Sequence, residues 1–215
     1  MHPPARGHVR SAFAVFAIVA FLWSAATPVY AAAPDERGCY VSFTMTLSTR
    51  DGGPRRVREA RVLPDCSVVI GDESDSSSHR ADGKVAGRDP TCRLINRLHG
   101  IPGAFDTLTE LTTYNNWAYD GTLVTAQSMS SGHWEQAVTG WYIWSGPTSS
   151  QDTTAPAFRV EAYTTAQFRS NTPYDWTHTK NNWVRVYGDG TCNATYQHIG
   201  NVCGGCGVVA YLDVY

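Results

Sequence analysis

A two-residue alternation of apolar and polar side chains is the feature that most constrains this chain. Between Cys39 and Leu47 every odd position is apolar, and the even positions from 42 to 48 are Ser or Thr. Residues 158–169 and 207–215 show the same period. Because successive side chains of a strand point to opposite faces, this period predicts half-buried β-strands.

Turn signals lie between the extended runs. Asp120-Gly121 and Asp189-Gly190 each separate two such runs, and Asp-Gly predicts a tight hairpin because both turn positions need positive φ. The turn at residues 50–54 is expected to return residues 57–63 beside the first strand as another hairpin. Many short strands with this spacing predict an all-β fold, a two-layer antiparallel β-sandwich of jelly-roll or immunoglobulin-like type.

One short helix is expected near residues 90–99. Asp89 is a suitable N-cap, Pro90 suits the first helical position, and Gly100 can end the helix. Its buried face would hold three apolar residues, namely Cys92, Ile95 and Leu98. A helix of barely three turns would be a peripheral element of such a fold.

The first 31 residues have the layout of a secretory signal peptide. Arg6 and Arg10 precede an uncharged apolar stretch that begins at Ser11, and small residues close it at Ala31. This order is typical of a segment that is cleaved on export. We therefore expect a secreted, extracellular protein: signal peptide 1–31, a single domain over residues 32–215, and no membrane span after cleavage.

Charge excludes one class of partner. Residues 1–31 hold two arginines and no acid, so their removal leaves 15 basic and 19 acidic side chains. Phosphate recognition needs clustered positive charge, so we expect no nucleic-acid partner. Residues 72–89 have no hydrophobic period and predict an exposed polar loop.

The six cysteines predict a disulfide framework. An even number of cysteines in an exported chain favours complete pairing. They form two clusters of three, so at least one bridge must join the clusters if all are paired: Cys39, Cys66 and Cys92; Cys192, Cys203 and Cys206.

The Cys203-Gly-Gly-Cys206 motif has three interpretations: a redox pair, half of a zinc site, or structural disulfides. A redox pair sits at the start of a helix, but an alternating strand follows this motif. A zinc site needs a second close pair, and Cys192 has no partner beside it. We therefore expect structural disulfides, with the glycines allowing two cysteines to bridge in different directions.

Two acid–histidine pairs are candidate catalytic residues. His133 and Glu135 are two positions apart, on one face of a strand, and Asp175 precedes His178 by three positions. Either pair is able to serve as an acid–base unit of a hydrolase. No histidines have metal-ligand spacing, so no metal site and no cofactor are expected. Calcium at Asp120 and Asp189 is the weaker alternative to ordinary turn chemistry.

Aromatic residues supply the candidate binding surface. Six tryptophans follow the signal peptide, all between Trp117 and Trp183. In the strand at residues 141–144, Tyr142 and Trp144 share one face, and Trp141 and Ile143 share the other. Exposed rings with polar edges favour sugar rings or a protein surface as ligand. The candidate ligand-binding residues are Trp144, Tyr142, Trp117 and Trp176.

These observations favour a binding protein over an enzyme. The expected function is a secreted binding module for carbohydrate or a cell-envelope polymer, with an extracellular glycan or a surface protein as partner. The alternatives are a small secreted hydrolase and a secreted protease inhibitor or toxin-like protein. We expect a monomer, and Asn193-Ala-Thr195 is a glycosylation sequon with meaning in a eukaryotic host.

Overall fold

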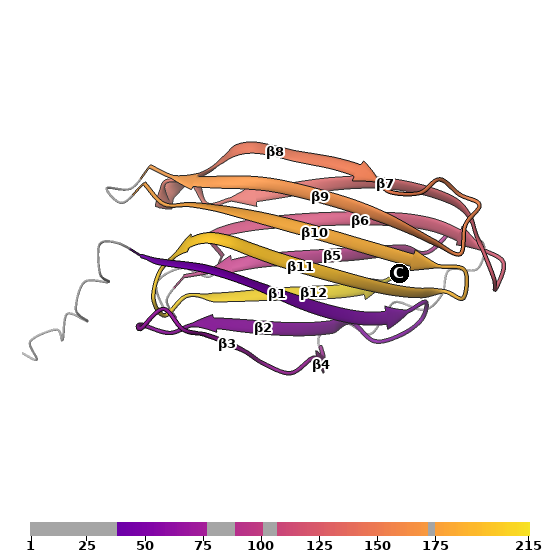
Figure 1. Ribbon diagram of the computed structural model, residues 1–215, viewed down its shortest axis with the longest axis horizontal. Helices are drawn as coiled ribbons and strands as arrows, with labels where there is room; N and C mark the ends of the chain where they lie inside the picture. Colours follow the sequence, from indigo (N-terminus) through magenta and orange to yellow (C-terminus); the bar gives the residue numbers. More distant parts are fainter. Residues whose placement is uncertain (1–37, 77–88, 101–106, 172–174) are drawn as a thin grey trace, which may run out of the picture. The chain divides into compact units, whose positions relative to one another are not determined.

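The computed structural model describes residues 38–76, 89–100, 107–171 and 175–215. These residues form two antiparallel sheets that face each other, with nearly aligned strands (Figure 1). This confirms the predicted two-layer sandwich. Jelly-roll or immunoglobulin-like connectivity stays a prediction. The expected signal peptide at 1–31 and most of the expected loop at 72–89 lie outside the described residues.

Sheet A has five strands, each antiparallel to its neighbours. In spatial order they are β1 (Cys39–Arg50), β11 (Thr191–Val202), β10 (Thr177–Tyr187), β9 (Arg159–Ser170) and β8 (Trp141–Gln151). Since β1 begins the described chain and β11 nearly ends it, this sheet depends on pairing between distant segments.

Sheet B has seven strands. Six run in the order β3 (Val68–Ile70), β2 (Arg56–Val62), β12 (Gly207–Val214), β5 (Thr91–His99), β6 (Thr109–Tyr119) and β7 (Val124–Glu135), and β4 (Ser74–Asp75) pairs with β2. A short 3-10 turn, Ala137–Thr139, leads from β7 in sheet B to β8 in sheet A. No helix of the described part is long and apolar enough to cross a membrane.

The core lies between the sheets and follows the alternation. Along β1 the odd positions are buried and the even positions are exposed. Other strands of both sheets show the same alternation of buried and less buried positions. Burial of the inward apolar side chains supplies most of the free energy that favours folding. Core residues include Met45, Leu94, Leu98, Leu111, Trp117, Phe168, Val184, Tyr196 and Leu212.

Two side chains cover part of the open edge of β1. The Ser48 N–H donates to Glu73 Oε1 at 3.2 Å, and Arg58 Nη1 donates to the Thr46 carbonyl at 3.3 Å. An open edge otherwise presents backbone groups that can pair with another chain. Glu73 and Arg58 therefore protect the carboxyl half of this edge.

The expected helix near 90–99 is wrong, because Thr91–His99 is strand β5. Its neighbours are β12 and β6, so it lies inside sheet B. Leu94 and Leu98 point into the core, while Ile95 lies on the outer face and is still only 6% exposed. Apolar residues on both faces mimic the spacing of a helix, and sheet pairing overrides that local pattern.

The expected hairpin between β1 and residues 57–63 is also wrong. The chain turns after Arg50, but β1 pairs with β11 and β2 pairs with β12 and β3. The turn therefore carries the chain from one sheet to the other. In contrast, both Asp-Gly hairpins are confirmed: Asp120-Gly121 joins β6 to β7, and Asp189-Gly190 joins β10 to β11.

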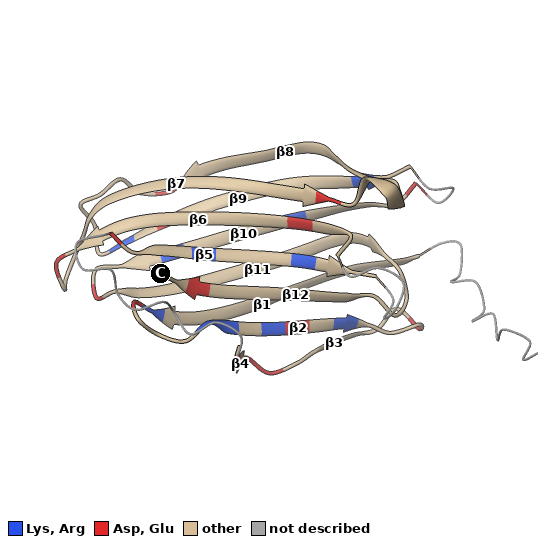
Figure 2. Cartoon of the chain, turned by 180° about the vertical axis from the view of Figure 1, so that it is seen from behind, with Lys and Arg blue, Asp and Glu red and all other residues tan. Residues whose placement is uncertain are grey.

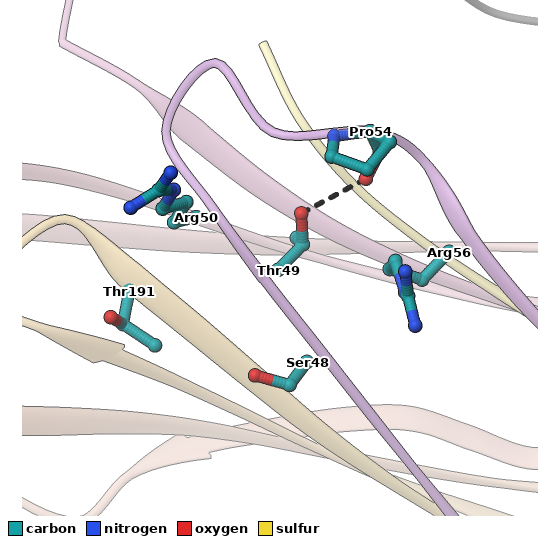
Figure 3. A pocket seen from close by; sticks show the side chains of 6 residues that line it. All are labelled: Ser48, Thr49, Arg50, Pro54, Arg56 and Thr191. Atoms are coloured by element: carbon teal, nitrogen blue, oxygen red, sulfur yellow. Dashed lines mark hydrogen bonds between the residues drawn. The ribbon is translucent and has the colours of Figure 1, made fainter. Parts of the chain in front are cut away.

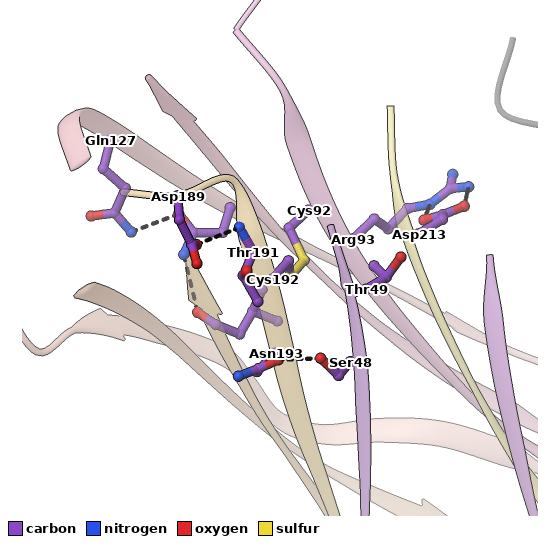
Figure 4. The surroundings of a disulfide bond; sticks show 12 residues. Ser48, Thr49, Cys92, Arg93, Gln127, Asp189, Thr191, Cys192, Asn193 and Asp213 are labelled. Carbon is purple, nitrogen blue, oxygen red and sulfur yellow. Dashed lines mark hydrogen bonds and ion pairs between the residues drawn. A yellow bond between two sulfur atoms is a disulfide. The ribbon is translucent and has the colours of Figure 1, made fainter. Parts of the chain in front are cut away.

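Three disulfides brace the sandwich, and the described residues include no free cysteine. Cys92 on β5 pairs with Cys192 on β11 and ties sheet B to sheet A across 100 positions (Figure 4). This is the predicted bridge between the two cysteine clusters. Cys39 on β1 pairs with Cys66, which lies between β2 and β3.

Cys203 and Cys206 pair with each other, so the expectation that they bridge in different directions is wrong. The motif forms the tight turn between β11 and β12, where Gly205 has φ +90° and the Cys206 N–H donates to the Cys203 carbonyl at 3.1 Å. The other four cysteines already pair among themselves. The motif closes the turn that carries the chain from sheet A to sheet B, which agrees with a structural role.

Candidate functional site

Two of the four candidate binding residues, Tyr142 and Trp144, lie on the outer face of sheet A, at its β8 margin. Along β8, Trp141 is buried at 4% exposure, and Ile143 packs partly against the core. Tyr142 and Trp144 point outward; Tyr142 is half-buried and Trp144 is 56% exposed. The parity of this strand therefore divides its aromatic residues as the sequence predicts.

Trp144 is held in place by two neighbours. The Tyr142 ring meets it edge-on at a centroid distance of 6.2 Å, and the Arg169 guanidinium lies 4.6 Å from its ring centroid. Arg169 in turn donates from Nε and Nη2 to the two carboxylate oxygens of Asp175, both at 2.6 Å. This bidentate bond lowers the pKa of Asp175 and raises the pKa of Arg169.

A second aromatic pair lies on the same face. Tyr163 on β9 and Trp183 on β10 are directly opposite in the register, with ring centroids 5.1 Å apart. The Tyr163 hydroxyl donates to Asn181 Oδ1 at 2.9 Å, and Asn181 Nδ2 donates to Gln197 Oε1 at 3.1 Å. The sequence reasoning did not include Tyr163 and Trp183 as site residues. The alternation along the strand would have revealed Trp183, because Val184 and Val186 point inward and Trp183 therefore points outward.

The rest of this outer face is rich in uncharged polar side chains. On β1 and β11 the outward positions are mostly Ser, Thr, Asn and Gln. Sheet B differs, because charged residues gather on its strands β2, β5, β6 and β12 (Figure 2). There Arg93 pairs with Asp213, and Arg55 and Arg97 lie over the Tyr211 ring. The aromatic pairs of sheet A are thus bordered by hydroxyl and amide groups, by the Arg185–Glu161 ion pair beside Tyr163 and Trp183, and by the Arg169–Asp175 pair beside Trp144.

The other two candidate tryptophans lie elsewhere. Trp117 is 1% exposed and belongs to the core, so its inclusion among the ligand-binding residues is wrong. It points inward from β6, where its ring stacks near Tyr119 at 6.1 Å. Trp176 is partly buried against the core, with its ring beside Gly38. Of the three candidate tryptophans, Trp144 is therefore the one that is exposed.

The structure does not form the expected Asp175–His178 pair. Asp175 is exposed and its carboxylate is bound by Arg169. His178 points into the core from β10, at 1% exposure, and its Nε2 lies 3.1 Å from Thr109 Oγ1. The two side chains point to opposite sides of the sheet, so this interpretation is wrong.

The other acid–histidine pair is formed. His133 Nε2 lies 3.5 Å from Glu135 Oε2 near the end of β7, and both side chains are about one-third exposed or less. Glu135 is directly opposite Thr109 in the β6–β7 register. Thr109 therefore neighbours Glu135 on one side and His178 on the other. His178 is buried, whereas the His133–Glu135 pair is partly exposed.

A shallow pocket lies at the end of β1 (Figure 3). Most of its polar side chains already have protein partners: Ser48 Oγ donates to Asn193 Oδ1 at 2.6 Å, and Thr49 Oγ1 donates to the Pro54 carbonyl at 2.9 Å. Arg56 is bound by Glu73 and Asp75. These partners leave little for a ligand to bind, so we do not place the functional site here.

The calcium candidates take part in turn hydrogen bonds. Asp120 Oδ1 accepts from the N–H groups of Thr122 and Leu123, and Asp189 Oδ1 accepts from that of Thr191. These bonds lower the pKa of both carboxyls. Within the described ranges, no three acidic, histidine or cysteine side chains are grouped to hold a metal ion.

No protein family, curated protein or solved structure matches the chain. Its class is therefore defined by the structure alone, as a disulfide-braced two-layer β-sandwich. Three disulfides are compatible with a secreted protein.

Proposed function

We propose that the protein is a secreted binding module that holds a neutral polysaccharide or cell-envelope polymer on the outer face of sheet A. The observation that carries this proposal is Trp144, a large ring that is 56% exposed beside Tyr142 and Arg169. An exposed ring presents an apolar surface with polar edges, which suits the apolar face of a sugar ring. Neighbouring hydroxyl and amide groups suit the sugar hydroxyls.

The two aromatic pairs favour an extended ligand. Trp144 contacts Arg169, and Trp183 contacts Tyr163. Both of these contacted residues, Arg169 and Tyr163, are on β9. Arg169 and Tyr163 are six residues apart, which corresponds to about 20 Å at the rise of an antiparallel strand. A single small sugar would reach one pair, whereas a polymer would contact both.

Preorganisation supports the same function. Arg169 is fixed by Asp175, and Tyr163 is fixed by Asn181, so neither aromatic pair needs to be ordered when a ligand binds. A rigid surface loses less conformational entropy on binding than a mobile one.

The test is retention of the protein on insoluble polysaccharides, namely cellulose, chitin and peptidoglycan. The Trp144→Ala variant should lose about tenfold or more in affinity for the polymer that the unaltered protein retains. Trp134→Ala is the matched control, since Trp134 is 46% exposed but lies on β7 of sheet B. Equal binding by both variants, or no retention of the unaltered protein on any polymer, would contradict the proposal.

The hydrolase alternative depends on the His133–Glu135 pair. If this pair is catalytic, the protein should release soluble sugars from one of the same polymers, and Glu135→Gln should stop the release without preventing retention. The inhibitor or toxin-like alternative stays a prediction.

A further inference from the structure

Three basic side chains lie together between the sheets, and we call them the base cluster: His178 and Lys180 on β10, and His198 on β11. None is more than 1% exposed. Lys180 is directly opposite His198 in the register, and the imidazole rings of His178 and His198 stack at 4.9 Å. Buried basic groups are rare and usually have an acidic partner.

The base cluster links sheet A to sheet B. Lys180 Nζ donates to the Thr109 carbonyl at 2.8 Å and to the Asn96 carbonyl at 3.4 Å. His178 Nε2 contacts Thr109 Oγ1 from the same strand. Next along β10, Asn182 accepts a hydrogen bond from Asn96 at 2.6 Å. The interface at this level is therefore held by polar bonds as well as apolar packing.

No carboxylate of the described residues bonds to the base cluster. Its contacts from β1, β8, β9 and β11 are Phe43, Trp141, Phe168 and Tyr196, of which only Tyr196 titrates. From sheet B, Glu110 and Arg97 act at a distance with opposite signs on Lys180, and they pair with each other. His133 and Glu135, near Thr109 on β7, likewise pair with each other.

Burial without a carboxylate partner opposes protonation. It lowers the pKa of His178 and of Lys180 well below their ordinary values, and it lowers the pKa of His198 to about 3. Within the described part, Nδ1 of His178 and Nε2 of His198 have no hydrogen-bond partner. A proton added there would be a buried donor without an acceptor, close to a second basic ring.

The cluster has little room to relax around such a proton. Gly200 faces His178 in the register, and a Cβ at Gly200 would lie 2.6 Å from the His178 Cα. β10 and β11 are therefore in close contact at this level. When the cluster is protonated, separation of sheet B from sheet A costs less free energy than separation of β10 from β11.

The links between the two sheets determine where the sheets can separate. Cys92–Cys192 ties β5 to β11, and Cys39–Cys66 ties β1 to the segment after β2. Both bridges lie on the β1 and β11 side of sheet A, and none of the described bridges involves β7, β8, β9 or β10.

The β7 and β8 edges are linked by the turn Ala137–Thr139, by the backbone hydrogen bonds between Val124 and Ala157, and by the bond from Ser149 Oγ to Ser131 Oγ, none of which is a disulfide. We propose that the base cluster is an acid-sensitive catch, whose protonation separates the sheets along the β7 and β8 edges while the disulfides keep them joined at the other side.

The sign of the pH dependence follows from linkage. Unfolded histidines hold a proton below about pH 6.5 and unfolded lysine below about pH 10.4, whereas the folded cluster resists protonation. The unfolded state thus binds more protons, and stability falls as pH falls. Each such proton raises the unfolding equilibrium constant about tenfold per pH unit.

Denaturant unfolding of the full secreted chain, measured from pH 9.5 to pH 5, tests the catch. We expect the unfolding constant to rise as the pH falls from 9.5 to 8, because of Lys180, and to rise more steeply below pH 6, where the two histidines also take up protons in the unfolded state. Lys180→Met should remove the alkaline slope, and His198→Gln should remove one proton from the acidic slope. His133→Gln is the control, because it removes a histidine that is one-third exposed and lies outside the base cluster.

Hydrogen exchange at pH 5 then locates the opening. Amides of β7, β8 and β9 should lose protection at least tenfold more than those of β1 and β11. A stability that is flat from pH 9.5 to 5 in the unaltered protein would overturn the proposal even if the variants fail to fold. Equal loss of protection on both sides would also overturn it.

Discussion

Replacing Trp141 and Trp144 by Ala, one at a time, tests whether Trp144 is a surface residue available to a ligand or a residue that the core needs for stability. The two residues lie three positions apart on β8, but Trp141 is 4% exposed and Trp144 is 56% exposed. Trp141 packs against His178 with ring centroids 4.8 Å apart. Its removal leaves a cavity between the sheets.

The expected loss of stability is smaller for Trp144 than for Trp141, by up to about twofold. A buried Trp→Ala change costs about 3–5 kcal/mol, which corresponds to a fall in Tm of roughly 6–20 °C for a domain of this size. For Trp144, a ring of about 200 Å² that is a little less than half covered loses at most about 2 kcal/mol of transfer free energy, and no cavity forms. The lost contact with Arg169 adds about 0.5–1 kcal/mol.

Thermal melting followed by near-ultraviolet circular dichroism measures both changes. Trp134→Ala, at 46% exposure on the other sheet, should behave like Trp144→Ala. If Trp144→Ala lowers Tm as much as Trp141→Ala does, then Trp144 supports the core and the proposed binding surface does not exist.

Three further outcomes are expected. The intact mass of the oxidised protein should be about 6 Da below its reduced mass, and peptide mapping should recover Cys92–Cys192; a free thiol at Cys203 or Cys206 would contradict the assigned pairing. Gly200→Ala should destabilise the fold by more than about 3 kcal/mol in chemical denaturation, because the new Cβ would lie 2.4 Å from the Thr177 carbonyl oxygen at a φ of +133°; a loss below about 1 kcal/mol would show that β10 and β11 can separate easily. Arg169→Gln should return the pKa of Asp175 toward its ordinary value in an NMR titration, and an unchanged pKa would show that the bidentate bond does not persist in solution.

The sequence predicted those strands whose two faces have different surroundings. β1 has core on one side and solvent on the other, so its period is clear. β5 has no such contrast, because Ile95 is covered on the outer face where Arg97 lies over Tyr211. Local spacing then resembled a helix, and only the position of β5 inside a sheet distinguishes the two.

The candidate site was predictable as far as strand parity decides it. Parity placed Tyr142 and Trp144 on one face and Trp141 on the other, without saying which face is outward. It also did not reveal that Trp117 lies in the core, since the outward positions of β6 are partly covered as well. The partners of each side chain depend on contacts between strands far apart in sequence. That is why Asp175 binds Arg169 and not His178.

The pairing of β1 with β11 has a consequence for how the protein reaches its folded state. Cys39 is opposite Val202 and Arg50 is opposite Thr191, so the first described strand finds its sheet partner only after most of the chain has been made. Such distant pairing makes folding slow, because loop closure must precede the stabilising contacts. During synthesis the chain emerges from its amino end, and β1 must remain unpaired until β11 follows. A chain shortened before Thr191 should therefore never complete sheet A and should aggregate through its exposed strands.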